Sequence, residues 1–215
     1  MKKFFLGLLD WIYKKKCYFC RRSTECVKMC SECYDEMEHL PIRVNRIIDG
    51  KKVYCAGVYE KNLQKLIRGL KYHNQRDLAY YLAKFMAEYW ENITDDKDFQ
   101  IVPVPIFEKR RKQRKYNHMN LVAEELAKLT GFNYNPDIIK RIKNTKPQYN
   151  LKKLQRTENL KDAFEVDKSK LKQGEILIID DICTTGSTFK EMIAEFKKSN
   201  IDNIVCLAAT TPFGD

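Results

Sequence analysis

EILIIDDICTTGST, residues 175–188, contains the signals from which the rest of the architecture can be inferred. Its first part, residues 176–179, is an unbroken apolar run that is too short for a buried helix. Such a run is typical of a strand covered on both faces, as in the middle of a parallel sheet. Asp180 and Asp181 follow where the strand is expected to leave the core, and small or hydroxyl-bearing residues occupy positions 184–188.

A helix is predicted directly after this loop, because apolar residues recur at positions 189, 192, 193 and 196. The first backbone N–H groups of a helix lack partners within it, and with the helix dipole they favour an anion. The sequence therefore predicts a phosphate site, with two carboxylates beside it for sugar hydroxyls or a divalent metal. An ordinary turn with an acidic cap is the alternative, but adjacent carboxylates repel each other and are costly for packing alone.

This block resembles the PRPP-binding (phosphoribosyl pyrophosphate-binding) motif of type I phosphoribosyltransferases, in which two acids precede a Thr-Thr-Gly-x-Thr loop. The match runs position by position through Asp180, Asp181, Thr184, Thr185, Gly186, Ser187 and Thr188. The resemblance implies that the acidic pair holds the ribose hydroxyls of PRPP, directly or through Mg²⁺. It also implies that the loop wraps the 5′-phosphate.

The length of 215 residues allows one α/β domain with a small appendage. No segment reaches the ~18 consecutive apolar residues of a membrane span. The net charge of +11 favours polyanionic partners, although Lys-rich proteins without such partners are also common. Eight cysteines without an export signal argue against a disulfide framework, and they predict a reducing, cytoplasmic location.

Four cysteines near the N-terminus form two C-x-x-C pairs separated by nine residues: Cys17, Cys20, Cys30 and Cys33. This spacing predicts a tetrahedral zinc site that is structural, because four thiolates fill the coordination sphere. Cys26 is a spare that could substitute for Cys30, and His39 is a more distant candidate. Structural zinc contributes on the order of 10–16 kcal/mol in peptides, enough to fold a segment with almost no apolar core.

The N-terminal sequence MKKFFLGLLDWIYKKK resembles a signal peptide only superficially, because Asp10 interrupts the apolar part and no small-residue cleavage site follows. It predicts a short amphipathic helix that covers the following domain, with a peripheral membrane-surface anchor as the alternative. We expect residues 1–50 to hold this helix and the zinc module, with residues 41–50 as the connection. Residues 51–215 are expected to form the α/β domain.

Further strands are predicted over residues 52–60, 100–105 and 203–210, and helices over about 61–71, 76–90 and from Asn117 to Gly131. The run EKRRKQRKYN, residues 108–117, is predicted to be a loop leaving the second strand. Loops at the carboxyl ends of parallel strands meet at the ligand crevice, so this loop and the acidic pair should share an edge. Arg114 is the candidate for binding the pyrophosphate of the ligand, because its guanidinium group can hold two oxygens at once. The long polar segment 141–164 is interpreted as a flap.

The whole chain resembles the ComF/ComFC competence family, which includes GntX-like proteins. Besides the cysteines and the PRPP motif, the matching positions are Gly69, Leu70, Lys71, Tyr72, Val102, Pro103, Val104, Pro105, Arg114, Tyr116, Asn117, Thr145, Lys146, Pro147, Gln148, Leu151, Arg156, Asn159, Ala163 and Phe164. Lys115 and His118 depart from the family's Gly and Gln. The resemblance implies a type I phosphoribosyltransferase fold: a parallel sheet with helices on both faces and a smaller hood. It also implies that Lys71 belongs to the PRPP site.

Two classes of function follow from this resemblance. One is an active phosphoribosyltransferase that uses Asp180, Asp181 and Arg114 on an unidentified acceptor. The other is a competence protein that binds PRPP with Mg²⁺ and handles incoming single-stranded DNA with the DNA-transport machinery. In the second case the zinc module and the basic run would contact DNA or that machinery. We expect a nucleotide-like ligand in the sheet crevice and a polyanion along the basic edge.

Overall fold

The computed structural model describes residues 16–24, 28–94, 98–143 and 162–212. The predicted N-terminal helix lies almost wholly outside these residues, as do Cys26 and most of the predicted flap. No helix within the described ranges is long and apolar enough to cross a membrane.

A central sheet has the strand order β1-β2-β8-β7-β3-β4. Its strands are β1 (Arg46–Ile48), β2 (Lys51–Val58), β3 (Phe99–Pro103), β4 (Asn133–Tyr134), β7 (Glu175–Ile182) and β8 (Ile204–Thr211). Every pairing is parallel except that of β1 with β2. A second, antiparallel sheet pairs β5 (Ile139–Arg141) with β6 (Phe164–Val166). The three longest predicted strands and the βαβ unit at the end of the chain are thereby confirmed.

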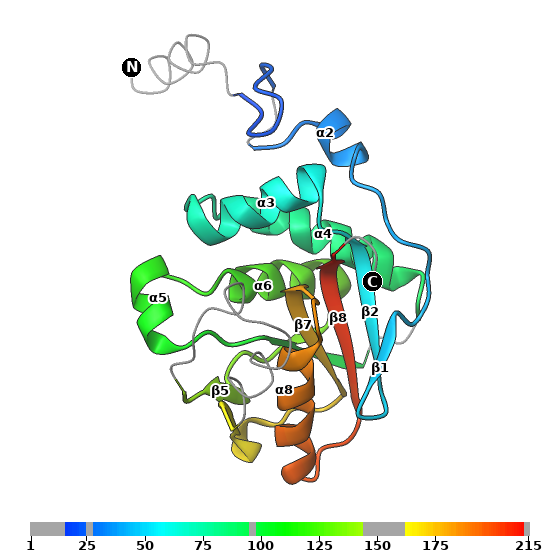
Figure 1. The fold of residues 1–215 in the computed structure, drawn as a ribbon, viewed down its shortest axis with the longest axis vertical. Coiled ribbons are helices and arrows are strands. Elements are labelled where there is room, and N and C mark those ends of the chain that lie inside the picture. The colour runs from blue at the N-terminus through cyan, green and yellow to red at the C-terminus, as the bar shows by residue number, and fades with distance from the viewer. Residues whose placement is uncertain (1–15, 25–27, 95–97, 144–161, 213–215) are drawn as a thin grey trace.

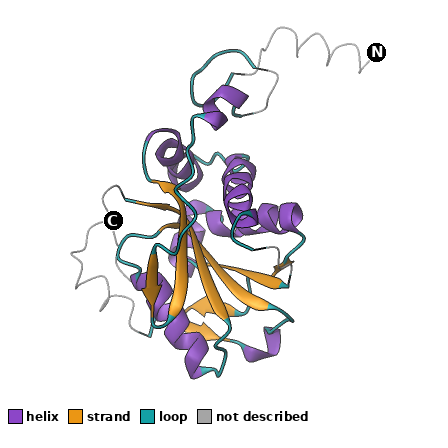
Figure 2. Ribbon diagram, turned by 90° about the vertical axis from the view of Figure 1, so that its right-hand side faces the viewer, coloured by secondary structure: helices purple, strands orange, loops and turns teal. Residues whose placement is uncertain are grey.

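Helices cover both faces of the central sheet (Figure 2). The helices of the described residues are α2 (Ser31–Asp35), α3 (Lys61–Tyr72), α4 (Leu78–Glu91), α5 (Glu108–Arg114), α6 (His118–Thr130), the short 3-10 helix η2 (Lys168–Lys170) and α8 (Ser187–Lys198). Apolar residues of α3, α4 and α6 share one core with Leu177 and Ile179 of β7. Ile176 and Ile178 belong instead to the core that α8 completes on the opposite face. The predicted α/β architecture, with β7 covered on both sides, is confirmed.

Two segments differ from the prediction. Residues 108–114, expected as part of a loop, form α5, with Glu108 in the first turn and Arg and Lys in the last. That distribution complements the helix dipole, and Lys112 pairs with Glu108 at 3.3 Å. Residues 41–50, expected as a connection, contain β1, which turns into β2 through Asp49 and Gly50. Both turn residues have positive φ, 47° and 79°, as a type I′ hairpin turn requires.

The segment with the paired cysteines, residues 16–37 and here called the cysteine module, packs against α3 and α4 (Figure 1). Its buried residues belong to the same core as those two helices: Cys17, Phe19, Met29, Cys30, Cys33 and Met37. Lys65 of α3 donates to the carbonyl of Phe19 at 2.7 Å. Tyr34 donates to Glu88 of α4, also at 2.7 Å. The module is therefore fixed on the helical layer, while the division of domains at residue 50 stays a prediction.

Candidate functional site

The acidic pair lies inside β7, directly before Ile182, the last residue of the strand. Successive side chains of a strand point to opposite faces, so the two carboxylates separate. Asp181 points to the face covered by α3 and α6, where it contacts Lys71 and His118. Asp180 belongs to the other face, and its Oδ1 accepts a hydrogen bond from the backbone N–H of Asp181 at 2.9 Å. The acids thus border the same edge of the sheet from its two sides.

A buried network neutralises Asp181. Lys71 Nζ lies 2.7 Å from Asp181 Oδ2, and His118 Nε2 contacts the same oxygen. Burial acts to raise the pKa of Asp181, but Lys71 and then His118 hold this pKa below its usual range. Burial lowers the pKa of His118 despite the nearby carboxylate. The arrangement is that of an ionised carboxylate between an ammonium group and a neutral imidazole that donates its Nε2–H.

Asp180 has the opposite electrostatic environment. Its pKa lies well above its usual range, first because of burial and then because of the charge on Asp181. Two carboxyl groups this close titrate as a pair. Asp181 therefore remains an acceptor while Asp180 favours a proton, so together they can both accept from and donate to the hydroxyls of a sugar.

Replacing His118 with Gln, which keeps an N–H donor for Asp181, is expected to remove an acid-sensitive part of the stability. The pKa of His118 is lower in the folded state, so its contribution is complete above the unfolded value of about 6.5 and is lost as pH falls. From about pH 7.5 to pH 5.5 the wild type should lose up to about 1.4 kcal/mol more of its unfolding free energy than His118→Gln. Urea unfolding measures this, and equal losses in both proteins would contradict the assignment.

The loop between β7 and α8 leads into the start of a twelve-residue helix. Gly186 is the N-cap of α8 and has no side chain to cap the helix, whereas Thr185 Oγ1 accepts a hydrogen bond from the backbone N–H of Ser187 at 3.4 Å. The Gly186 φ of 74° favours glycine, and a Cβ at this position would also force the end of the Ile48 side chain to move. Thr185 Oγ1 and Ser187 Oγ lie 2.6 Å apart at the same point. Backbone N–H groups and hydroxyls therefore converge as an anion site does.

Arg46 of β1 supports this loop and was missed from the sequence. Its Nη1 donates to the carbonyl of Thr184 at 2.6 Å, across 138 positions of the chain. The dipeptide Asp49-Gly50 is typical of hairpin turns, so it could have predicted a strand at Arg46 before the turn. β1 thus contributes both Arg46 and Ile48 to the backbone path of the loop.

Several cations border the same edge. Arg114, at the end of α5, stacks its guanidinium 5.3 Å from the centroid of the Tyr72 ring, and its charge helps to lower the pKa of His118. Arg141 of β5 was not singled out from the sequence. Burial, followed by the charge of Arg110, lowers its pKa to about 10, and Asp180 opposes this shift. Lys71, Arg114 and Arg141 therefore place positive charge around the acidic pair.

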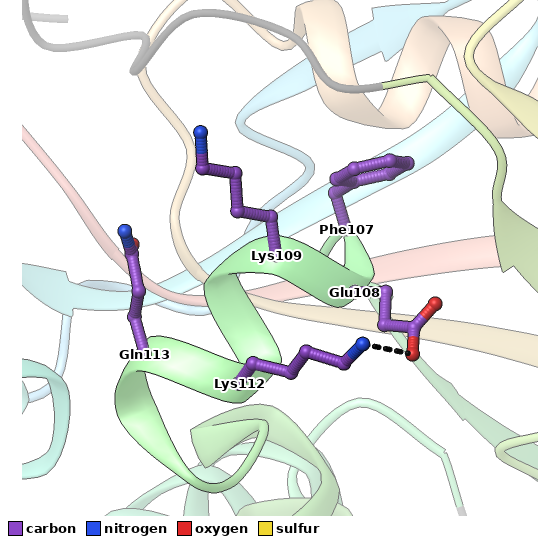
Figure 3. A pocket seen from close by; sticks show the side chains of 5 residues that line it. All are labelled: Phe107, Glu108, Lys109, Lys112 and Gln113. Atoms are coloured by element: carbon purple, nitrogen blue, oxygen red, sulfur yellow. Dashed lines mark ion pairs between the residues drawn. The ribbon is translucent and has the colours of Figure 1, made fainter.

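Lys109 and Lys112 of α5 are exposed. Lys109, Lys112 and Gln113 line a cavity of about 570 Å³ together with Phe107 and Glu108 (Figure 3). The ion pair of Lys112 with Glu108 lies in this lining. Within the predicted basic run, Arg114 and Arg110 are thus linked to the acidic edge, Arg110 through its charge on Arg141, while Lys109 and Lys112 lie on an exposed helical surface.

The structure brings the four predicted cysteines together. The Sγ atoms of Cys17, Cys20, Cys30 and Cys33 all lie within 4.8 Å of one another. Cys17 Sγ also accepts the backbone N–H groups of Phe19 and Cys30, at 3.4 and 3.5 Å. A hydrogen bond from Arg22 lowers the pKa of the Cys20 thiol to about 6. Four sulfur donors with such support could hold a zinc ion.

The other candidate ligands in the described residues lie elsewhere. His39 is stacked on Phe85 and its Nε2 lies 2.8 Å from the Phe85 carbonyl oxygen. Cys183 and Cys206 are buried in the core beneath α8, as packing residues.

Comparison with known proteins identifies relatives along most of the chain. No protein-family model matches it. Competence protein F of Haemophilus influenzae is 28% identical over 200 residues, 87% of this chain and 86% of the relative. DNA utilization protein YhgH of Salmonella typhimurium is 27% identical over 186 residues, with 82% and 81% covered. Competence protein ComFC of Bacillus subtilis is 25% identical over 175 residues, with 80% and 67% covered.

A comparison with solved structures returns adenine phosphoribosyltransferase from Thermoanaerobacter pseudethanolicus, with a TM-score of 0.36 and 13% identity over 65% of this chain and 83% of that one. The resemblance read from the sequence is confirmed by the curated relatives: over most of its length the chain is homologous to proteins named competence protein F, ComFC and DNA utilization protein YhgH.

Proposed function

We propose that this chain binds PRPP, or a similar phosphorylated ribose, at the carboxyl edge of its sheet, and that it acts in competence by handling incoming single-stranded DNA. The observation that carries the ligand proposal is the start of α8, where the positive end of the helix dipole, the Gly186 N-cap and the hydroxyls of Thr185 and Ser187 lie together. The competence role is supported by the names of the relatives, two of which are competence proteins.

In this proposal Thr184, Thr185, Gly186, Ser187 and Thr188 surround the 5′-phosphate, and the acidic pair faces the ribose hydroxyls. Lys71 and His118 both use Oδ2 of Asp181, so Oδ1 is the oxygen offered to the ligand. Arg114 and Arg141 supply charge for the pyrophosphate.

Carboxylates beside a phosphate site also suit Mg²⁺, which would bind with the ligand and neutralise part of its charge. In the cysteine module we propose a structural zinc ion on Cys17, Cys20, Cys30 and Cys33, whose four sulfur donors match the preference of that metal.

Calorimetric titration with PRPP and Mg²⁺ tests the ligand proposal. The wild type should bind one equivalent only when Mg²⁺ is present, and the double variant Asp180→Asn/Asp181→Asn should show no binding heat. Asp137→Asn removes an exposed carboxylate and should bind as the wild type does. Zinc content should be equal in all three proteins. A wild type that shows no heat would overturn the proposal.

A further inference from the structure

A cavity of about 410 Å³ lies between the cysteine module and the polar side of α3. Its lining consists of Tyr18, Arg21, Gln64, Lys65, Arg68 and His73. Three of these residues are permanent cations and none is a carboxylate. The cavity on α5 differs, because Glu108 lines it and pairs with Lys112. The cleft beside α3 is therefore the stronger site for an anionic ligand.

The aromatic wall of this cleft is held in place by the fold. Tyr18 Oη lies 2.8 Å from His73 Nδ1. Gly69 lets the ring approach α3, because a Cβ there would lie 3.3 Å from Tyr18 Cε1 and 2.6 Å from Leu78 Cδ1. Arg21 and Lys65 approach the same ring, with centroid distances of 5.9 and 5.6 Å. An aromatic ring flanked by cations is thus fixed before any ligand arrives.

A row of cations on α3 leads from the cleft to the acidic edge of the sheet. The helix KNLQKLIRGLKY contains four basic residues and no acidic one. Arg68 and Lys71 are three residues apart and so lie on one face of the helix. Burial raises the pKa of Tyr59, and the charges of Lys71 and Arg68 both oppose this rise. Because Lys71 itself contacts Asp181, the row is continuous with the proposed ligand site.

We propose that this cleft binds single-stranded nucleic acid, with Arg21, Lys65 and Arg68 facing backbone phosphates and Tyr18 offering a surface on which a base stacks. Single-strand sites combine cations along the backbone with aromatic stacking platforms. A duplex fits this cleft poorly, since its bases are stacked on one another and must be unpaired to reach a side chain. The inference rests on the proposed handling of single-stranded DNA, and it places that contact on α3 rather than on α5.

Fluorescence anisotropy of a labelled oligothymidylate about 20 nucleotides long, with zinc-loaded full-length protein, tests the assignment. Tyr18→Leu should weaken binding by about 5- to 150-fold, the value of one stacked base, while Tyr18→Phe should bind like the wild type. Arg21→Gln/Arg68→Gln should flatten the slope of log affinity against log salt by about 1.4, because two phosphate contacts are lost. Lys52→Gln/Lys190→Gln removes two exposed charges elsewhere and should leave the slope unchanged.

The outcomes separate this inference from the function on which it rests. If the wild type binds the oligonucleotide and only the substitutions Lys109→Gln/Lys112→Gln weaken this binding, the assignment to the cleft is wrong, while the proposed handling of DNA stands. A wild type that binds no oligonucleotide would overturn both. Two further results would contradict the assignment of the cleft to single-stranded nucleic acid. One is an affinity for duplex DNA equal to that for the oligonucleotide. The other is a loss of binding to anionic vesicles in the Tyr18 and Arg21/Arg68 variants while their binding to the oligonucleotide is unchanged. PRPP titrations of Arg21→Gln/Arg68→Gln should match the wild type, since those residues lie outside the phosphate loop.

Discussion

Replacing Lys71 with Met is expected to lower the free energy of unfolding by about 3–5 kcal/mol, because it leaves the buried Asp181 without its principal countercharge. Lys71 and Asp181 expose only 17% and 6% of their side chains, so solvent screens their interaction little. The same change should weaken PRPP binding, since Asp181 would take up a proton at a higher pH. Urea unfolding at neutral pH measures the first effect, and calorimetry measures the second.

Two further variants isolate the cause. Lys71→Met/Asp181→Asn removes both charges and should recover most of the lost stability, because no unpaired charge remains buried. Lys112→Met breaks an ion pair of 3.3 Å whose partners are 75% and 60% exposed, and it should cost less than about 1 kcal/mol. Similar losses in Lys71→Met and Lys112→Met would show that the buried network does not stabilise the fold as described.

Replacing Cys30 with Ser is expected to abolish zinc binding and to detach the cysteine module from the helical layer. A structural zinc ion contributes on the order of 10–16 kcal/mol in isolated peptides, far more than the apolar contacts of so short a segment. Because Cys17, Phe19 and Met29 share a core with α3 and α4, their loss should expose the adjoining surface of those helices.

Elemental analysis and hydrogen exchange over residues 61–72 measure these two effects. Cys183→Ser is the matched control, since Cys183 is also buried but lies in the core beneath α8, and this variant should keep its zinc. A Cys30→Ser protein that retains one zinc per chain would rule out the four-cysteine assignment.

The parts of the molecule that the sequence predicted well have strong local signals. The apolar run of β7, the periodic residues of α8 and the two C-x-x-C pairs each identify their structure within a few residues. The positive φ of Gly131 at the end of α6 was predictable for the same reason. By contrast, α5 was taken for a loop because its seven residues carry no apolar stripe, and its charges indicate a helix only weakly.

The details of the site depend on contacts between distant segments. Asp181 meets His118 across 63 positions, and Arg46 meets Thr184 across 138, so no local pattern contains either pair. The placement of Asp180 and Asp181 on opposite faces of the sheet could have been predicted, because side chains alternate along a strand and β7 extends to Ile182. Sequence reasoning placed the acids beyond the strand and therefore treated them as equivalent.

Hydrogen exchange of the backbone amides of residues 184–188, with and without PRPP and Mg²⁺, tests the central claim most directly. If the start of α8 receives the 5′-phosphate, exchange of these amides should slow on adding the ligand, and the exposed surface of α5 around Lys109 should be unchanged. Binding heat without protection at residues 184–188, or protection confined to α5, would contradict the account.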